Sequence, residues 1–232
     1  MPTIFGHPQD HRALEQWLDS PQGRLVLQAE AQLLQETLDG VFGWQLLQLG
    51  GWGASRQLLA CSRTQRQTVI AEHDQAAGVG LVARLSALPI QSASVDAVLL
   101  PHTLEFQPDP QAVVREADRV LAGEGQLIIL GFRPLSAWGV RAALTRGGHP
   151  PGLRRLLSGR RLRDWLALLG YDVLPTRRCL SSVLSPFGGI SMIRARKRLY
   201  TPTPLRPRLS WSLQGKRALI GDAVSPTIRD QL

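Results

Sequence analysis

The chain has 232 residues, of which 44% are hydrophobic, enough for one large globular domain or for one domain with a small appendage. No apolar run reaches the roughly 18 residues that a membrane span needs, and the first residues lack the basic and then apolar order of a secretory signal. Composition therefore argues against a transmembrane or secreted class. The two cysteines, Cys61 and Cys179, are predicted to be buried thiols, so we expect a cytoplasmic protein.

Charge is unevenly distributed along the chain. Residues 1–145 carry 10 Arg or Lys and 14 Asp or Glu, a net charge of −4, and residues 146–232 carry 17 and 4, a net charge of +13; together they give the overall +9. A basic half of this kind predicts contact with a polyanion such as nucleic acid, an anionic lipid surface or an acidic protein. The alternative is coding bias, because all but two of the 27 basic residues are Arg.

Residues 1–43 are predicted to form two helices that pack on the core. The first helix covers residues 10–19. Ser20 and Pro21 suit the N-cap and first residue of the second, which runs to Leu38. Its apolar spacing predicts an inner face made of Leu25, Ala29, Leu33 or Leu34, and Leu38.

Strands and helices alternate from residue 44 onward. The expected strands cover residues 44–49, 68–72, 81–84, 95–100 and 126–132, and the expected helices cover 55–60 and 110–121. Asp109 and Pro110 suit the N-cap and first residue of the second of these helices. This order predicts a parallel sheet with helices on both faces. Between the first strand and the first of these helices lies the glycine cluster of LLQLGGWG, Leu46–Gly53. Open α/β sheets bind ligands at such a turn.

The remainder of the chain departs from this regular order. Residues 133–157 are too long for a simple connection, so a lid or substrate loop is expected there. A helix capped by Ser158 covers 159–169, and strands over 171–179 and 190–196 are expected to close the sheet edge as a hairpin. Residues 197–232 are predicted to be a basic, proline-containing extension.

Five short sequence patterns follow one another between Leu85 and Leu130. They are Leu88-Pro89, Val95-Asp96, Leu104-Glu105, Arg119-Val120-Leu121 and Gly123–Gly125. Together with the glycine turn and Glu72, they resemble the class I S-adenosylmethionine-dependent methyltransferases of the type 11 group, over about residues 44–132. The resemblance implies a Rossmann-like α/β domain over residues 44–196, with a mostly parallel seven-stranded sheet, an antiparallel edge strand and helices on both faces.

The resemblance also implies which residues hold the cofactor, S-adenosyl-L-methionine. Glu72 would hold the ribose hydroxyls, and the backbone of Leu85 would face the adenine edge. Pro101 and His102 would line the methionine end of the cofactor. The glycine loop around its amino-acid part would comprise Gly50, Gly51 and Gly53.

Four positions of this cofactor site depart from the family pattern. Gln48 and Arg84 stand where the family usually has acids, and Trp52 and Ala54 stand where its loop usually has glycines. A guanidinium can only donate hydrogen bonds, so Arg84 reverses the polarity of its contact. Each lost charged contact is expected to cost about 1.5–3 kcal/mol of binding free energy.

Candidate catalytic and substrate residues are few, because methyl transfer mainly requires that the acceptor, methyl group and sulfur be aligned. His102 is the candidate base for an acceptor that must lose a proton, with Glu105 on the substrate side. The alternative is that His102 caps the strand end and Glu105 supports the next turn. Trp138 is expected to line an acceptor pocket or to anchor a helix. Because His7, His11 and His73 lack ligand spacing, no metal site is predicted.

The sequence thus predicts a methyltransferase that acts on an unidentified acceptor. Two alternatives stay open. One is a catalytically inactive member of the fold that serves as a binding or regulatory protein. The other is a nucleic-acid-binding protein that uses the basic C-terminal half, in which case binding would weaken steeply with salt.

Overall fold

The computed structural model describes residues 8–52, 58–73, 78–134, 136, 140, 150–179 and 189–199, and every structural statement below concerns these residues. The chain divides into two units, residues 1–199 and 200–232, of which only the first contains described residues. The predictions for Gly53, Trp138, the 55–57 part of the first crossover helix and the extension beyond residue 199 therefore lie outside the description. No described helix is both long and apolar enough to cross a bilayer.

The two helices predicted before the first strand are present as α1 (Pro8–Leu18) and α2 (Pro21–Leu38). The hydroxyl of Ser20 caps α2 by accepting from the Gly23 N–H at 3.2 Å. The predicted inner face of α2 was partly wrong, because Leu25 is 60% exposed. The face that is buried instead consists of Gly23, Val26, Glu30, Leu34, Thr37 and Leu38.

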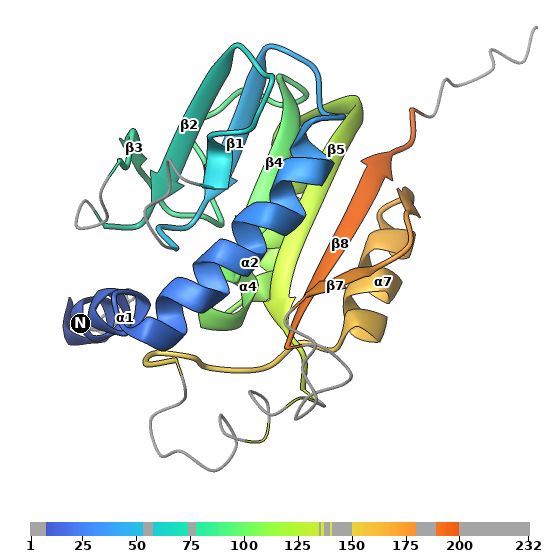
Figure 1. Cartoon of the computed structure of the whole chain (residues 1–232). Helices are drawn as coiled ribbons and strands as arrows, with labels where there is room; N and C mark the ends of the chain where they lie inside the picture. Colours follow the sequence, from blue (N-terminus) through green and yellow to red (C-terminus); the bar gives the residue numbers. More distant parts are fainter. Residues whose placement is uncertain are drawn as a thin grey trace, which may run out of the picture. The chain divides into compact units, whose positions relative to one another are not determined.

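The sheet contains eight strands in the order β3-β2-β1-β4-β5-β8-β6, with β7 also paired to β8 (Figure 1). Strands β1 to β5 run parallel, and β8 is antiparallel to all three of its neighbours. The strands are β1 (Gln45–Leu49), β2 (Arg66–Ala71), β3 (Leu81–Val82), β4 (Val95–Pro101), β5 (Leu121–Phe132), β6 (Tyr171–Val173), β7 (Arg177–Cys179) and β8 (Ile190–Lys197). The predicted mostly parallel α/β fold with a Rossmann-like sheet is confirmed.

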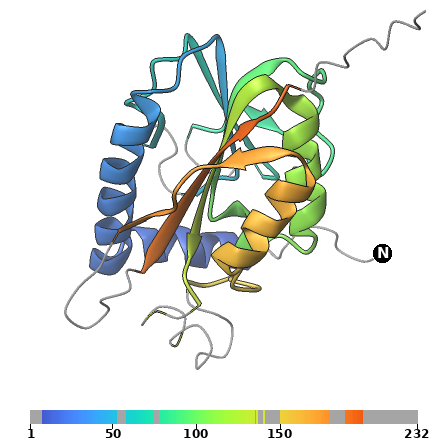
Figure 2. The same cartoon turned by 90° about the vertical axis from the view of Figure 1, so that its right-hand side faces the viewer.

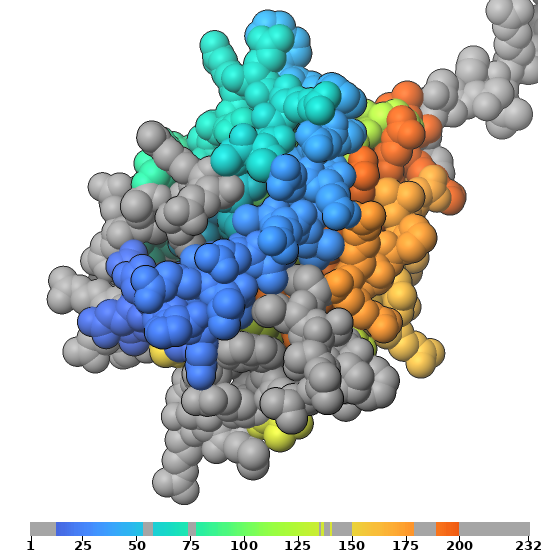
Figure 3. Space-filling model, viewed as in Figure 1, coloured from blue at the N-terminus to red at the C-terminus, as the bar shows by residue number. Residues whose placement is uncertain are grey.

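Helices cover both faces of the sheet (Figure 2). On one face, α5 (Pro110–Val120) and α7 (Gly159–Leu168) bury side chains such as Val113 and Leu162 against the sheet. On the other face, α2 buries Val26 and Leu34. The space-filling view shows α1 and α2, in blue, lying over this second face (Figure 3). The N-caps predicted for α5 and α7 are also present, because Asp109 accepts from the Ala112 N–H at 3.0 Å and Ser158 from the Arg161 N–H at 3.3 Å.

The C-terminal strands differ from the prediction in number and position. The single strand expected over 171–179 is divided into β6 and β7, and the register on β8 shifts by one residue between them, so that residues 174–176, which include Pro175, face residues 193–194. The sheet therefore has eight strands rather than seven. The antiparallel strand β8 lies between β5 and the β6 and β7 pieces instead of at the edge.

The expected lid and the expected burial of the cysteines agree with the structure only in part. Residues 150–157 of the expected lid contain no helix or strand, and the N–H groups of Arg154 and Arg155 donate to the Glu105 carbonyl at 3.1 and 3.2 Å. This contact ties the segment to the carboxyl end of β4, and a lid role stays a prediction. Cys61 is a free thiol that is partly exposed rather than buried.

Candidate functional site at the carboxyl ends of the parallel strands

The turn after β1 is held close to the end of β4. Gly50 has φ +99°, a left-handed conformation that favours glycine, and a Cβ there would lie 2.6 Å from Thr103 Oγ1. The Thr103 hydroxyl in turn donates to the Leu49 carbonyl, and the Gly50 N–H donates to the Ile70 carbonyl at 2.8 Å. Glycine is therefore required at position 50 both by conformation and by space.

Gln48 lies directly before this turn and is fully buried. Its amide nitrogen donates to the Gly50 carbonyl at 3.1 Å, which orients the turn. Its amide oxygen Oε1 is buried and accepts no hydrogen bond from the residues that the structure describes. An unpaired buried acceptor is costly, so this oxygen is a marker of a position where a donor from a ligand would be favourable.

Glu72 follows the last residue of β2 and remains partly exposed. Its Oε1 accepts from the Leu85 N–H at 3.4 Å, and its Oε2 accepts from the Gln107 side-chain amide at 3.1 Å. Each carboxylate oxygen can accept a further hydrogen bond. The structure thus brings together Glu72 and Leu85, two residues that the sequence had assigned to the cofactor.

Arg84 and Pro101 occupy contrasting positions. The Arg84 side chain is exposed, in the segment that leads from β3 to Leu85. Pro101 is the buried last residue of β4, and its carbonyl accepts from the Thr103 hydroxyl at 3.3 Å. Gly51 is partly exposed directly after the turn at Gly50.

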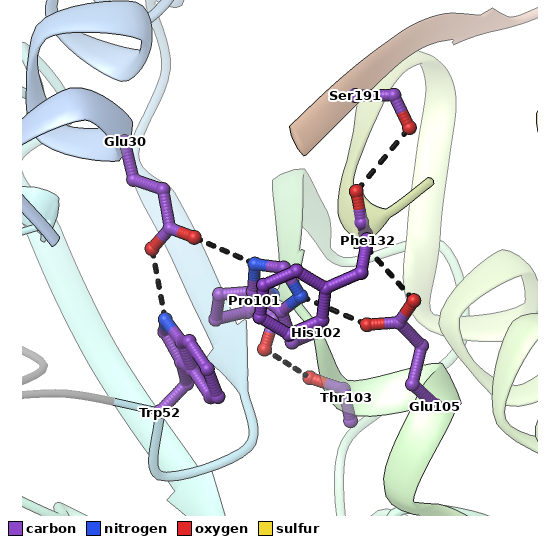
Figure 4. Close-up of polar contacts among 9 residues, drawn as sticks. Glu30, Trp52, Pro101, His102, Thr103, Glu105, Phe132 and Ser191 are labelled. Atoms are coloured by element: carbon purple, nitrogen blue, oxygen red, sulfur yellow. Dashed lines mark hydrogen bonds and ion pairs between the residues drawn. The ribbon is translucent and has the colours of Figure 1, made fainter. Parts of the chain in front are cut away.

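A chain of buried polar groups lies on the other side of β1, over the ends of β4 and β5 (Figure 4). Glu30 of α2 accepts from Trp52 Nε1 through Oε2 at 2.8 Å, and its Oε1 lies 2.6 Å from His102 Nε2. His102 Nδ1 lies 2.8 Å from Glu105 Oε2, and Glu105 Oε1 accepts from the Phe132 N–H at 2.8 Å. We call Glu30, Trp52, His102 and Glu105 the buried network.

Aromatic rings enclose this network. The ring centroids of Trp52 and Phe132 lie 4.3 and 4.0 Å from that of His102, and Trp52 and Phe132 lie 5.8 Å from each other. Trp17 and Phe106 approach Trp52 at 6.1 and 5.9 Å. The exposed fractions are 0% for Glu30 and His102, 2% for Glu105 and 3% for Trp52, so the network is shielded from water.

Charge in the network is set by competition between burial and pairing. Burial by itself lowers the pKa of His102, but the charge of Glu30 and the hydrogen bonds to both carboxylates outweigh it and raise the pKa to about 9. Burial raises the pKa of Glu105, against the opposing effect of its hydrogen bond with His102. His102 is therefore an imidazolium at neutral pH, and both of its N–H groups donate to carboxylates.

Comparison with known proteins places this architecture in a family. A family described as "Methyltransferase domain" matches residues 41–129. The uncharacterized protein YafS of Escherichia coli (strain K12) is 34% identical over 214 residues, which cover 86% of this chain and 87% of YafS. The chain belongs to the class I S-adenosylmethionine-dependent methyltransferases.

Solved methyltransferase structures share the fold at low identity. A possible histamine N-methyltransferase from Thermotoga maritima has a TM-score of 0.61 and 20% identity, and the match covers 81% of this chain and 99% of that one. The 1,6-didemethyltoxoflavin-N1-methyltransferase of Burkholderia thailandensis, solved with its substrate and S-adenosylhomocysteine, has a TM-score of 0.56 and 17% identity, with 86% and 94% covered. These likenesses concern the fold.

The geometry around His102 and Glu105 favours structural roles over the base and substrate-side roles expected for them. A general base needs a free nitrogen, and both nitrogens of His102 face carboxylate oxygens. Glu105 is equally enclosed, with its oxygens directed to His102 and Phe132 rather than to a substrate. His102 also has φ +54°, a backbone conformation that costs about 1–3 kcal/mol for a residue other than glycine and that the network maintains.

Glu30 is the member of the site that sequence reasoning missed. It occupies the apolar stripe of α2, four residues after Val26 and four before Leu34. A lone carboxylate on a buried helix face needs a partner inside the protein. This interruption of the apolar pattern was the available signal, and Trp52 in the loop was the corresponding donor.

Proposed function

We propose that this chain transfers a methyl group from S-adenosylmethionine to an acceptor, with the cofactor held at the carboxyl ends of β1 and β2. The observation that carries the proposal is the Glu72 carboxylate, which stays partly exposed beside the narrow turn at Gly50. A ligand with a ribose diol fits such a carboxylate, because both hydroxyls can donate to it.

The described residues fit the rest of the cofactor as well. The unpaired Oε1 of Gln48 would accept a hydrogen bond from an ammonium group near the turn. Gly50 and Gly51 leave the backbone accessible there, and the backbone of Leu85 lies beside Glu72 on the adenine side. Pro101 and His102 are buried at the end of β4 next to the turn, and Arg84 is exposed on the proposed adenine side.

When bound, the cofactor supplies an electrophilic methyl group on its sulfonium. The chain's own contribution is to position and to exclude water, and the buried network performs both tasks. His102 is a positioning residue in this proposal, because it joins α2 to the end of β4 through Glu30. With no free nitrogen on His102, the acceptor is expected to reach the site with a nucleophilic atom that is already deprotonated.

Calorimetry with S-adenosylhomocysteine on the full chain tests the proposal. The wild type is expected to bind, and Glu72→Gln is expected to weaken binding about tenfold to a hundredfold, because one charge-assisted contact contributes about 1.5–3 kcal/mol. Glu36→Gln is the matched control, because Glu36 is an exposed carboxylate on α2 that pairs with Arg177. The absence of heat at millimolar ligand, with folded protein, would refute cofactor binding.

A binding or regulatory role without catalysis is the second candidate, and Trp52 favours it. The family usually has glycine at this position, whereas here an indole fills the space beside His102. Both candidates are compatible with cofactor binding, so single-turnover transfer of a labelled methyl group separates them. The proposed cytoplasmic location rests on the amino-acid composition described above.

A further inference from the structure

Most basic side chains of β7 and β8 are neutralised within the protein. Arg194 donates to the Gln126 side-chain oxygen at 2.7 Å. Four other basic residues on the same strands, or directly after them, form ion pairs. These pairs are Arg177 with Glu36, Arg196 with Glu124, Lys197 with Asp118 and Arg198 with Asp172. This part of the basic C-terminal half therefore offers little free charge to a polyanion.

Arg133 and Arg178 are different. Neither guanidinium has an ion pair or a hydrogen bond within the described part of the chain. Nη1 of Arg133 is buried nonetheless. Burial lowers the pKa of Arg133, and the nearby positive charge of Arg178 lowers it further. The two positive charges therefore repel each other.

Strand register places the two arginines on one face of the sheet. Ser191 of β8 pairs with Gly131 on one side and with Arg178 on the other. Arg133 follows Gly131 by two residues, and its N–H donates to the Gly189 carbonyl at 3.0 Å, which continues the ladder. Strands β5 and β7 flank β8, so their backbones lie about 10 Å apart. Two arginine side chains can reach a common ligand across that distance.

The sequence supplies no counter-charge nearby. The chain contains no Asp or Glu between Glu124 and Asp164, and none between Asp172 and Asp222. These two stretches include everything that directly follows β5 and everything that connects β7 to β8. An anion for Arg133 and Arg178 must therefore come from a distant part of the chain or from a ligand. The carboxylate of Glu105 reaches the neighbouring Phe132 N–H, but its two oxygens are already taken by that N–H and by His102.

The position of Arg133 relates this charge to the proposed reaction. Arg133 directly follows Phe132, whose ring contacts His102 and whose N–H binds Glu105. The Glu105 carbonyl also accepts from the N–H groups of Arg154 and Arg155, so further arginines reach the same edge. This edge lies over β4 and β5, on the side of β1 opposite to Glu72.

We propose that Arg133 and Arg178 form an anion-binding site that holds a carboxylate or phosphate group of the methyl acceptor. The assignment of the anion to a methyl acceptor rests on the proposed function, but the anion site can be tested by itself. Paired guanidinium groups suit both anions, because each presents parallel N–H donors to two oxygens. The acceptor would then be an acidic molecule whose charged group is held beyond the buried network.

Side-chain NMR of the ¹⁵N-labelled full chain tests this site. The arginine Nε–Hε signals are followed during titration with inorganic phosphate or with succinate, at an ionic strength kept constant with chloride. The signals of Arg133 and Arg178 are expected to shift along saturable curves. Arg133→Gln is expected to weaken the response of Arg178 at least fivefold, and Arg178→Gln, at an exposed position, to do the same for Arg133. Arg163→Gln, an exposed substitution on α7, is expected to change neither curve.

The outcomes separate the two proposals. Linear shifts of Arg133 and Arg178, equal to that of Arg163 with both anions, would overturn the anion site. Calorimetry with S-adenosylhomocysteine on the same samples reports on the proposed function independently. Saturable anion binding without cofactor binding would retain the site and refute its role in methyl transfer. The anion that binds more tightly identifies the acceptor's charged group as a carboxylate or a phosphate.

Discussion

The two sides of β1 are built in different ways. On the β2 side, Glu72 is partly exposed and has capacity for further hydrogen bonds. On the β4 and β5 side, Glu30 and His102 are fully buried and satisfy each other. The first side has the character of a ligand site, and the second has the character of a polar core. We therefore expect cofactor affinity and fold stability to depend on different residues, although these residues lie on neighbouring strands.

This contrast also accounts for the tryptophan at position 52 of the glycine loop. An indole at position 52 needs a buried acceptor for its N–H, and Glu30 provides it from the N-terminal helices. Glu30 in turn needs a cation, and His102 provides it. The substitution of Trp52 for a glycine is thus tied to two other residues, whereas Glu72 retains the family's residue by itself.

The largest effect is expected from breaking the network at its centre. Glu30→Ala leaves a buried imidazolium and a buried indole N–H without their acceptor, and this should lower the free energy of unfolding by about 3–5 kcal/mol. Urea denaturation measures the change. Glu36→Ala, on the exposed face of the same helix, should cost less than about 1 kcal/mol. Equal losses in the two variants would show that the network contributes nothing specific.

The next effect concerns pH. The pKa of His102 is about 9 in the folded protein and 6.5 in the unfolded chain, so the folded protein binds this proton more tightly. The resulting stability is complete below about pH 6.5 and is lost as the pH rises through about 9, up to about 3 kcal/mol in total. Urea denaturation at pH 6.5 and at pH 9 measures it.

His102→Asn is the matched variant for this pH test, because asparagine tolerates the left-handed backbone of residue 102. It should remove most of the decline between the two pH values. The raised pKa of Glu105 also favours the folded state at acid pH, and that contribution declines as the pH rises above about 4.5. Parallel profiles for the variant and the wild type would contradict the assignment to His102.

The sequence predicted what depends on local pattern. Ser20 and Asp109 were assigned as helix caps from their residue type and the proline that follows, and both accept the expected backbone N–H. Glu72 and Leu85 were assigned from family spacing, and the structure places them in contact. Such signals are short-range or carried by a family pattern.

The sequence could not predict what depends on distant pairing. Glu30 and His102 are separated by 72 residues and meet only because α2 crosses the ends of β4 and β5. Apolar spacing favoured Leu25 for the buried face of α2, because a pattern of apolar residues cannot show that a carboxylate is buried against a partner elsewhere in the chain. The same limitation left His102 open as either a candidate base or a structural residue, since one of its two carboxylate neighbours, Glu30, comes from a distant helix.

A smaller effect should appear at Gln48 on the cofactor side. Gln48→Glu removes the donor to the Gly50 carbonyl and buries a carboxylate, so the ligand-free protein should lose about 1–3 kcal/mol. Because that carboxylate would pair with an ammonium group, S-adenosylhomocysteine should raise the melting temperature more in this variant than in the wild type. Gln67→Glu is the control, because it removes an exposed side-chain donor to a carbonyl, that of Ser62, and it should change the stability little and the ligand-induced shift not at all. A smaller ligand-induced shift in Gln48→Glu would place the ammonium elsewhere.

The smallest effect is expected at Arg84, on the outer rim of the β2 side. The side chain is exposed, so water screens its charge, and Arg84→Asp should tighten cofactor binding by less than about fivefold, or 1 kcal/mol. Arg66→Asp makes the same charge change at an exposed position of β2 away from Leu85, and it separates a local contact from a general change in field. Calorimetry at two salt concentrations measures both variants. A gain in affinity of more than tenfold that is insensitive to salt and confined to Arg84→Asp would mean that residue 84 lies directly over the adenine. The β2 side with bound cofactor would then be as enclosed as the β4 side.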